Sequence, residues 1–148
     1  IMTIFHFTNE NHFLSNFYPA TFIWNDMQWD NSECAYQAAK SLDMYTQLSF
    51  TKMSAREAKK AGKTIKIRQD WEDVKVSIMT EIVYEKFSQN PHLIRLLLAT
   101  GSQKLEEGNN WGDTFWGVCP VGGYGQNWLG RILMSIRKDF QLQECGIE

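Results

Sequence analysis

Apolar and polar residues alternate only near the start of the chain, and in the rest apolar residues recur mainly at helical spacing. The alternation predicts a short strand over residues 4–7 and a β-hairpin with strands at 22–24 and 27–29, joined by a two-residue turn at Asn25 and Asp26. Helical spacing predicts helices over residues 32–48 and 55–61, from 71 to just before 90, from 91 to about 100, and after 127. We therefore expect a predominantly α-helical fold with a small N-terminal β component.

Residues that favour helix ends stand at the boundaries of these segments. Ser54 and Glu57 have the spacing of a capping box, and Gly62 stands where that helix should stop. Asp70 is expected to cap the helix that begins at Trp71. The other boundary residues are Asn31 or Ser32, Asn90 followed by Pro91, and Thr100 followed by Gly101.

The stretch from residue 31 to 40 combines a helix start with a carboxylate. Glu33, Gln37 and Lys40 follow at i, i+4 and i+7 and share one helix face. The opposite face is apolar and small, with Ala35, Ala38, Ala39 and Leu42. Two interpretations stand at this point. The face is either solvated and charged, with Glu33 stabilised by the helix dipole, or polar and able to reach a substrate.

Length and charge limit the functional classes. A chain of 148 residues fits one domain, and no linker or repeat divides it, so we expect a single domain over 1–148. The net charge of −2 gives no broad phosphate-backbone footprint, so any nucleic-acid contact should be local. No apolar run approaches the roughly 20 residues of a membrane span. Three scattered cysteines predict reduced thiols, a cytoplasmic location and no metal site.

Two segments lack a clear period and are expected to be ordered but irregular. Residues 13–22 mix aromatics with Ser15, Asn16 and Pro19 and predict a loop. Residues 102–127 combine glycines with aromatics, and the run that ends at Asn127 could expose backbone N–H groups to a phosphate or simply form a turn and a cap. Aromatic residues make up 14% of the chain and include six Trp, which fill a core or stack on a nucleobase.

Three charged residues outside the first helix are further candidates. Arg68 offers a fork for a phosphate, or a salt bridge with Asp70. Glu107 and Asp113 lie close to Trp116 in sequence and are either site acids or surface loop charges. None of these signals is specific alone.

Taken in order, the motifs resemble those of the NADAR superfamily, the YbiA-like N-glycosidases, over roughly residues 5–140. The matching segments are FLSNF at 13–17, SE at 32–33 with Gln37 and Lys40, Arg68 with DWE at 70–72, KF at 86–87, ATG at 99–101, Asp113 with WG at 116–117, and Gly125, Asn127, LG at 129–130 and LM at 133–134. The resemblance implies a compact, mainly helical domain that hydrolyses an N-glycosidic bond to ribose. Family members act on phosphorylated ribosylamino-pyrimidine intermediates of riboflavin synthesis or remove ADP-ribose from modified guanine bases.

By motif match, the family residues tied most firmly to activity are Glu33 and Trp71. Breaking a C1′–N bond builds positive charge on the ribose, which a carboxylate such as Glu33 can stabilise while it positions or deprotonates water. Asp113 or Glu107 would assist the departing base. The resemblance assigns the remaining contacts to a nucleotide-like substrate, or locally to ADP-ribosylated nucleic acid, without metal or redox cofactor, through Ser15, Asn16, Phe17, Gln37, Lys40, Arg68, Trp116, Gly125 and Asn127.

The chain departs from the family pattern at two places. Cys34 and Ala35 replace a His and an aromatic residue beside the Glu, which suggests a smaller pocket wall or a changed substrate. Residues 118–120 replace a glycine-rich run after WG. The sequence therefore leaves two rivals to an enzyme, a module that binds ADP-ribose or a nucleotide without cleaving it, and a helical interaction domain whose aromatics are all core.

Overall fold

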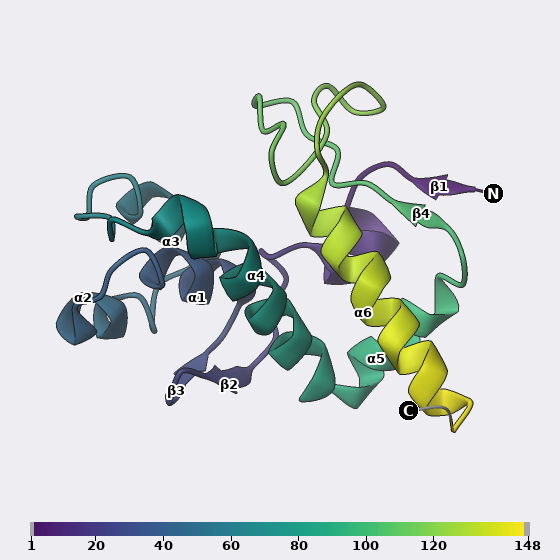
Figure 1. Cartoon of the computed structure of the whole chain (residues 1–148), viewed down its shortest axis with the longest axis horizontal. Helices are drawn as coiled ribbons and strands as arrows, with labels where there is room; N and C mark the ends of the chain where they lie inside the picture. The colour runs from purple at the N-terminus through teal and green to yellow at the C-terminus, as the bar shows by residue number, and fades with distance from the viewer. Residues whose placement is uncertain (1, 147–148) are drawn as a thin grey trace. The chain divides into compact units, whose positions relative to one another are not determined.

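The computed structural model describes residues 2–146 and is predominantly helical, as the sequence predicts (Figure 1). The helices are η1 (Asn9–Leu14, a 3₁₀ helix), α1 (Ser32–Ala38), α2 (Met44–Ser49), α3 (Ala55–Ala61), α4 (Trp71–Ser88), α5 (Pro91–Ala99) and α6 (Trp128–Glu144). The strands are β1 (Thr3–Ile4), β2 (Phe22–Trp24), β3 (Met27–Trp29) and β4 (Lys104–Leu105).

The chain divides into two compact units, which are described separately. Unit 1 comprises Ile1–Ser15 and Pro91–Glu148, and unit 2 comprises Asn16–Asn90. Unit 2 holds the β2–β3 hairpin and α1 to α4, whereas unit 1 holds η1, the β1–β4 pair, α5 and α6. The expectation of one domain over the whole chain stays a prediction.

The predicted hairpin of unit 2 is confirmed. Phe22 pairs with Trp29 at the open end, and both side chains are almost fully buried. Asn25 and Asp26 have φ values of 56° and 61°, the left-handed conformation that a tight two-residue hairpin turn requires of both central residues. Gln89, just after α4, makes two hydrogen bonds to the backbone of Ile23 in β2. Its Oε1 accepts the Ile23 N–H and its Nε2 donates to the Ile23 carbonyl, both at 2.8 Å. These bonds fasten the hairpin to the end of α4.

The predicted continuous helix over residues 32–48 is wrong, because the chain leaves the helical path after Ala38. The carbonyl of Lys40 accepts a hydrogen bond from the Arg68 N–H at 2.7 Å instead of continuing a helical ladder. Asp43 then caps a new helix, α2, with its carboxylate on the Thr46 N–H at 2.8 Å. Leu42, predicted to extend the apolar face, is 71% exposed.

The next two helices begin where predicted. Ser54 and Glu57 form both bonds of a capping box at the start of α3, which ends at Ala61 before Gly62. α4 begins at Trp71, but the Asp70 carboxylate makes no cap bond, because the Arg68 guanidinium holds it at 2.6 and 2.9 Å. The start of α4 is thus predicted correctly, but the mechanism expected for its cap is wrong.

In unit 1 the N-terminal strand is shorter than expected and is placed one residue earlier. Thr3–Ile4 pairs in parallel with Lys104–Leu105, a partner about 100 residues later that local alternation does not reveal. The segment predicted as an irregular loop from residue 13 begins inside η1, whose Phe13 and Leu14 are buried. α5 starts at Pro91 as expected and packs on η1 and α6.

The apolar stripe of α6 lies in the core of unit 1, as helical spacing after residue 127 predicts. The buried stripe of α6 packs with α5 and β4 and consists of Leu129, Ile132, Leu133, Ile136 and Phe140.

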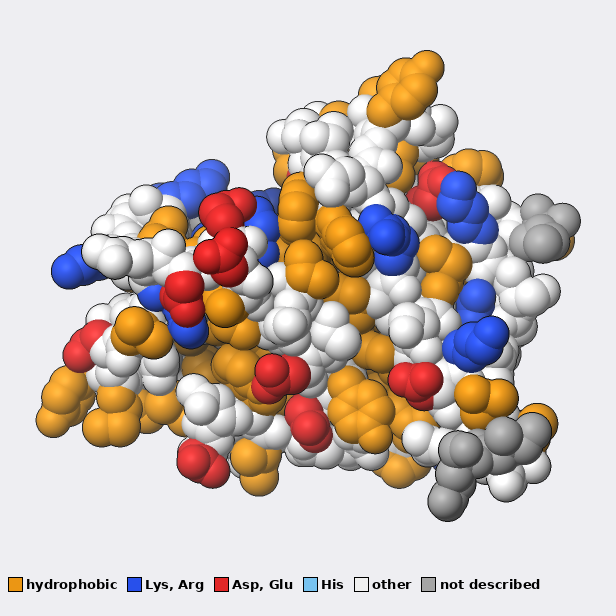
Figure 2. All heavy atoms as spheres, viewed as in Figure 1, with side chains coloured by type: hydrophobic (Ala, Val, Ile, Leu, Met, Phe, Trp, Pro, Cys, Tyr) orange, Lys and Arg blue, Asp and Glu red, His pale blue; other side chains and the backbone are white. Residues whose placement is uncertain are grey.

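α2 of unit 2 buries none of its side chains, and Figure 2 shows hydrophobic side chains gathered on the surface where α2 lies. Within residues 2–146, no helix is both long enough and apolar enough to cross a bilayer.

Candidate active site

The first turn of α1 holds a buried carboxylate. Asn31 caps the helix with its side-chain oxygen 2.8 Å from the Cys34 N–H, as one of the two expected cap residues. The Glu33 N–H donates to the carbonyl of Asn16 at 3.1 Å, so the predicted site residue Asn16 lies at the start of this helix. Glu33 is only 8% exposed, which overturns the interpretation of a solvated charged face.

Gln37 holds the Glu33 carboxylate from one turn further along α1. Its Nε2 donates to Glu33 Oε2 at 2.7 Å, as the i, i+4 spacing predicts. Gln37 is itself 5% exposed. Two buried oxygens beside this pair, Ser32 Oγ and Gln37 Oε1, find no hydrogen-bond partner among residues 2–146. Buried polar atoms are normally paired, so these two mark an unusual position.

Two aromatic rings and a lysine from α1, α4 and the segment after α1 lie near one another within unit 2. The Tyr36 and Trp71 ring centroids are 5.3 Å apart, and Trp71 is buried. Lys40 Nζ lies 5.7 Å from the Tyr36 ring centroid. Burial lowers the pKa of Lys40, while the negative charge of Glu33 opposes that shift. Tyr36 thus lies between Trp71 and Lys40, and Lys40, which lies beyond the end of α1, interacts with Glu33. The catalytic and binding roles of these residues stay predictions.

The remaining predicted residues of unit 2 differ in their contacts and in their exposure to solvent. Arg68 is bonded to Lys40 through the backbone, but its guanidinium is held in a two-point ion pair by Asp70. Asn16 is buried and donates to the Met79 sulfur at 3.5 Å. Phe17 is 36% exposed, and Lys59 Nζ lies 5.9 Å from its ring. The salt-bridge interpretation of Arg68 is therefore realised, and the guanidinium N–H groups outside this ion pair remain candidates for a phosphate.

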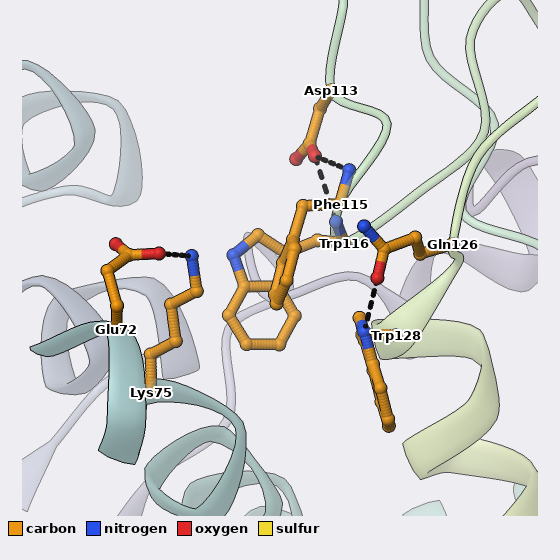
Figure 3. Close-up of polar contacts among 7 residues, drawn as sticks. All are labelled: Glu72, Lys75, Asp113, Phe115, Trp116, Gln126 and Trp128. Carbon is orange, nitrogen blue, oxygen red and sulfur yellow. Dashed lines mark hydrogen bonds and ion pairs between the residues drawn. The ribbon is translucent and has the colours of Figure 1, made fainter.

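In unit 1 the predicted acid Asp113 orders a loop. Its Oδ1 accepts the backbone N–H groups of Phe115 at 3.1 Å and Trp116 at 2.9 Å (Figure 3). The Phe115 ring lies edge-on to Trp116 with centroids 4.9 Å apart, and 6.4 Å from the Trp128 ring. Gln126 Oε1 accepts the Trp128 Nε1–H at 3.0 Å (Figure 3). The loop thus presents a group of aromatic rings that includes the predicted Trp116.

Asn109 organises the same loop and was not predicted from the sequence. Its Nδ2 donates to Glu107 Oε2 at 3.0 Å and to the Asp113 carbonyl at 2.8 Å, and its Oδ1 accepts the N–H groups of Trp111 and Asp113. It is 1% exposed. Its partners are mostly backbone groups of an irregular loop, so no residue pattern signals them.

The end of the loop brings Glu107, Gly125 and Asn127 together. Asn127 Oδ1 accepts the Glu107 N–H at 3.0 Å, and the Asn127 N–H donates to the Gly117 carbonyl. A side chain at Gly125 would overlap that same carbonyl, so the close backbone approach requires glycine. Ser15, the remaining predicted residue of this unit, ends η1 with its N–H on the His12 carbonyl. The binding roles of these residues stay predictions.

Tyr36 is a second residue of the candidate site that was not predicted from the sequence. The available signal was its i, i+4 spacing to Lys40 within the matched motif. Cys34 and Ala35, the two departures from the family pattern, are completely buried, and the Cys34 thiol donates to the Met53 carbonyl at 3.1 Å. Both side chains are therefore packed inside the protein, and the changed pocket wall or substrate stays a prediction.

Side chains of unit 2 can stabilise a cation next to a flat apolar wall. Glu33 supplies a carboxylate held in one orientation, Trp71 and Tyr36 supply ring surface, and Lys40 supplies a positive charge for an anionic substituent. Within residues 2–146, no group of three or more His, Cys, Asp or Glu is placed to bind a metal ion.

Comparison with known proteins gives consistent similarities. A family model described as the NADAR domain matches residues 4–141. An N-glycosidase of Nostoc punctiforme is 35% identical over 133 residues, covering 86% of this chain and 84% of that protein. N-glycosidase YbiA of Escherichia coli K12 is 34% identical over 121 residues, covering 78% of this chain and 73% of that protein.

A longer relative and a solved structure complete the comparison. A riboflavin biosynthesis protein of Vibrio vulnificus is 41% identical over 143 residues, covering 93% of this chain, but the chain spans only 38% of that protein. The NMR structure of Escherichia coli YbiA matches with a TM-score of 0.84 and 29% identity, over 99% of this chain and 88% of that one. The predicted helical, YbiA-like fold is thereby confirmed.

Proposed function

The chain belongs to the NADAR domain family, the YbiA-like N-glycosidases, and on that premise we propose that it hydrolyses the bond between ribose C1′ and a base nitrogen of a nucleotide-like substrate. The observation that carries the proposal is the Glu33 carboxylate, which is 8% exposed and oriented by Gln37 Nε2 at 2.7 Å. A buried, oriented carboxylate is costly to maintain, and this chemistry gives it a use.

The reaction follows from the charge that develops on the sugar. As the C1′–N bond breaks, its electron pair leaves with the base, and the ribose becomes oxocarbenium-like. Glu33 stabilises that positive charge and takes a proton from the attacking water, whose oxygen forms the new bond to C1′. Trp71 provides a wall for the base, and Lys40 offers a charge for a phosphate.

Two substrate classes fit this proposal. Relatives named riboflavin biosynthesis proteins support a phosphorylated ribosylamino-pyrimidine, whose anionic group would be bound by Lys40 or by the guanidinium N–H groups of Arg68 outside the ion pair with Asp70. The family resemblance also supports an ADP-ribosylated guanine, in a nucleoside or in nucleic acid bound by a local contact. Asp113 and Glu107 remain predicted aids to the leaving base, and a cytoplasmic location remains predicted from the thiols.

Release of free base from the two substrate classes tests the proposal. We expect the wild-type protein to release base from at least one of them, measured by mass spectrometry, and Glu33→Gln to be slower by about 10²- to 10⁴-fold. Glu10→Gln, an exposed acid on η1, is the matched control and should equal wild type. No release by wild type, or unchanged release by Glu33→Gln, would contradict the proposal. Tight binding without release in calorimetry would select the non-catalytic module.

A further inference from the structure

Gly62 has a backbone conformation that does not need glycine. It follows α3 with φ −60° and ψ −17°, which is right-handed helical geometry open to every residue. A glycine that stops a helix normally does so in the left-handed conformation. The reason for glycine at this position must therefore lie outside its backbone angles.

Space explains the glycine. A Cβ atom built on Gly62 would overlap Gln37 Oε1 and would lie 2.7 Å from Gln37 Cδ, closer than real contacts allow. α1 and α3 pack against each other, and both residues are buried. The side chain of Gln37 thus rests directly on the Gly62 backbone.

The side-chain amide of Gln37 is only partly hydrogen-bonded in this position. Its Nε2 bonds to Glu33 at 2.7 Å, while its Oε1 has no hydrogen-bond partner among residues 2–146. Turning the amide over would direct an oxygen at the carboxylate, so the bond to Glu33 decides its orientation. A buried oxygen without a partner costs stability, and such local costs are found where a function requires the geometry.

We propose that Gly62 and Gln37 act as a positioning pair for Glu33, in which Gly62 leaves room for the Gln37 side chain and Gln37 fixes the reacting carboxylate. The inference rests on the role proposed above for Glu33. Gln37 acts on the reaction through Glu33, and Gly62 acts through Gln37. Carboxylates that act on a reacting atom need such support, because misplacement by about 1 Å reduces the rate severely.

Substrate-free NMR tests the positioning pair independently of catalysis. The carboxyl carbon of Glu33 in ¹³C-glutamate-labelled protein reports the pKa of Glu33. Gln37→Ala removes a donor to the charged form and should raise this pKa, and Gly62→Ala should raise it too by displacing Gln37. The double variant should show no larger rise than Gln37→Ala. Lys60→Ala, an exposed change on α3, should leave it unchanged.

The other titratable groups near Glu33 stay the same in this comparison. Lys40 and Cys34 interact electrostatically with Glu33, and both are present in every variant. An unchanged pKa of Glu33 in either Gln37→Ala or Gly62→Ala would overturn the positioning pair. If Gly62→Ala alone fails to fold, the double variant should fold, since Gln37 no longer overlaps the added methyl group. Gln37→Met, which has a side chain of similar volume, then tests the loss of the Nε2 donor to Glu33. Failure of the double variant to fold would also overturn it.

Kinetics provide the second arm. Gly62→Ala and Gln37→Ala should each lower kcat by about tenfold or more with little change in KM, because a tilted carboxylate harms the transition state more than binding. Gly62→Ala should cause no further loss in the Gln37→Ala background, whereas equal losses in both backgrounds would overturn the coupling. If wild type releases no base, the proposed function fails, and the NMR coupling still decides whether the pair positions Glu33.

Discussion

The side-chain oxygen of Asn127 accepts a hydrogen bond from the backbone N–H of Glu107 at 3.0 Å. The Asn127 Nδ2 also donates to the Leu105 carbonyl at 2.9 Å, so the two ends of the side chain bond to the last residue of β4 and to the segment that follows it. Asn127 has φ 54°, a left-handed conformation that Asn adopts more readily than most residues. This relationship explains why Asn127 precedes α6 without capping it through its side chain.

Asn127→Ala should therefore destabilise the protein. It leaves the Glu107 N–H and the buried Leu105 carbonyl without these partners, which should lower the free energy of unfolding by about 2–4 kcal/mol in urea titrations. Asn127→Gly removes the same bonds but suits the positive φ. The difference in unfolding free energy between the two variants therefore measures the cost of placing alanine in this left-handed conformation. Gln143→Ala, exposed on α6, is the control. An unfolding midpoint equal to wild type for Asn127→Ala would show that the amide is dispensable for folding.

The ring contact between Trp71 and Tyr36 predicts separate effects on stability and binding. Trp71→Ala removes a buried ring at a centroid distance of 5.3 Å and should cost about 3–5 kcal/mol of unfolding free energy. Trp71→Phe keeps a ring against Tyr36, so it should fold normally and raise KM more than it lowers kcat if Trp71 walls the base. Thermal melting and steady-state kinetics separate the two effects. Unchanged KM and kcat in Trp71→Phe would remove Trp71 from the site.

Local signals predicted most of the fold. The capping box at Ser54, the turn at Asn25 and Asp26, and the helix start at Pro91 depend on residues within one turn of each other, so their chemistry is readable in sequence. The end of α1 was not readable, because the Lys40 carbonyl bonds to the Arg68 N–H from a distant part of the chain. Helical propensity alone could not foresee that tertiary bond.

The candidate site was predictable in residue type but not in environment. The i, i+4 spacing placed Gln37 beside Glu33, and the structure confirms their contact. That both would be buried depends on the packing of α3 and α4 against α1, which spacing does not reveal. Gly62 follows the end of α3 as predicted, but its contact with Gln37 joins two helices and so has no local signal in the sequence.

Lys86 predicts a pH dependence of stability. Burial lowers the pKa of this lysine from 10.5 to about 7, with its Nζ 5.1 Å from the Phe87 ring centroid. Between these two pKa values the unfolded chain binds a proton that the folded chain does not, so this group makes the unfolding free energy rise with pH across that window. Relative to Lys86→Met, wild type should therefore gain about 2 kcal/mol between pH 7 and pH 9.

Urea unfolding of both proteins at several pH values measures this difference. Lys138→Met, an exposed lysine on α6, controls for the loss of a surface charge and should show no comparable gain. A difference between wild type and Lys86→Met that is constant with pH, or that shrinks as the pH rises, would contradict the lowered pKa of Lys86.

Cys34 and Cys145 should differ sharply in reactivity. Burial raises the pKa of the Cys34 thiol to about 11, with a further increase from the nearby negative charges of Glu33, Asp30 and Glu57. Only the thiolate reacts with iodoacetamide, and at pH 8 a thiol with that pKa is ionised to about one part in 10³. Cys145 is exposed. We expect Cys145 to be alkylated at least about 100-fold faster, measured by mass spectrometry of tryptic peptides over time.

Urea supplies the control for the labelling experiment, because unfolding removes the burial that raises the pKa of Cys34 and should bring the two rates close together. Equal rates in the folded protein would contradict the buried thiol. A slow Cys34 also bears on the reaction, since a protonated, enclosed thiol is a poor nucleophile. Cys34→Ser should consequently retain base release, whereas Glu33→Gln should abolish most of it, which separates the neighbour of the carboxylate from the carboxylate itself.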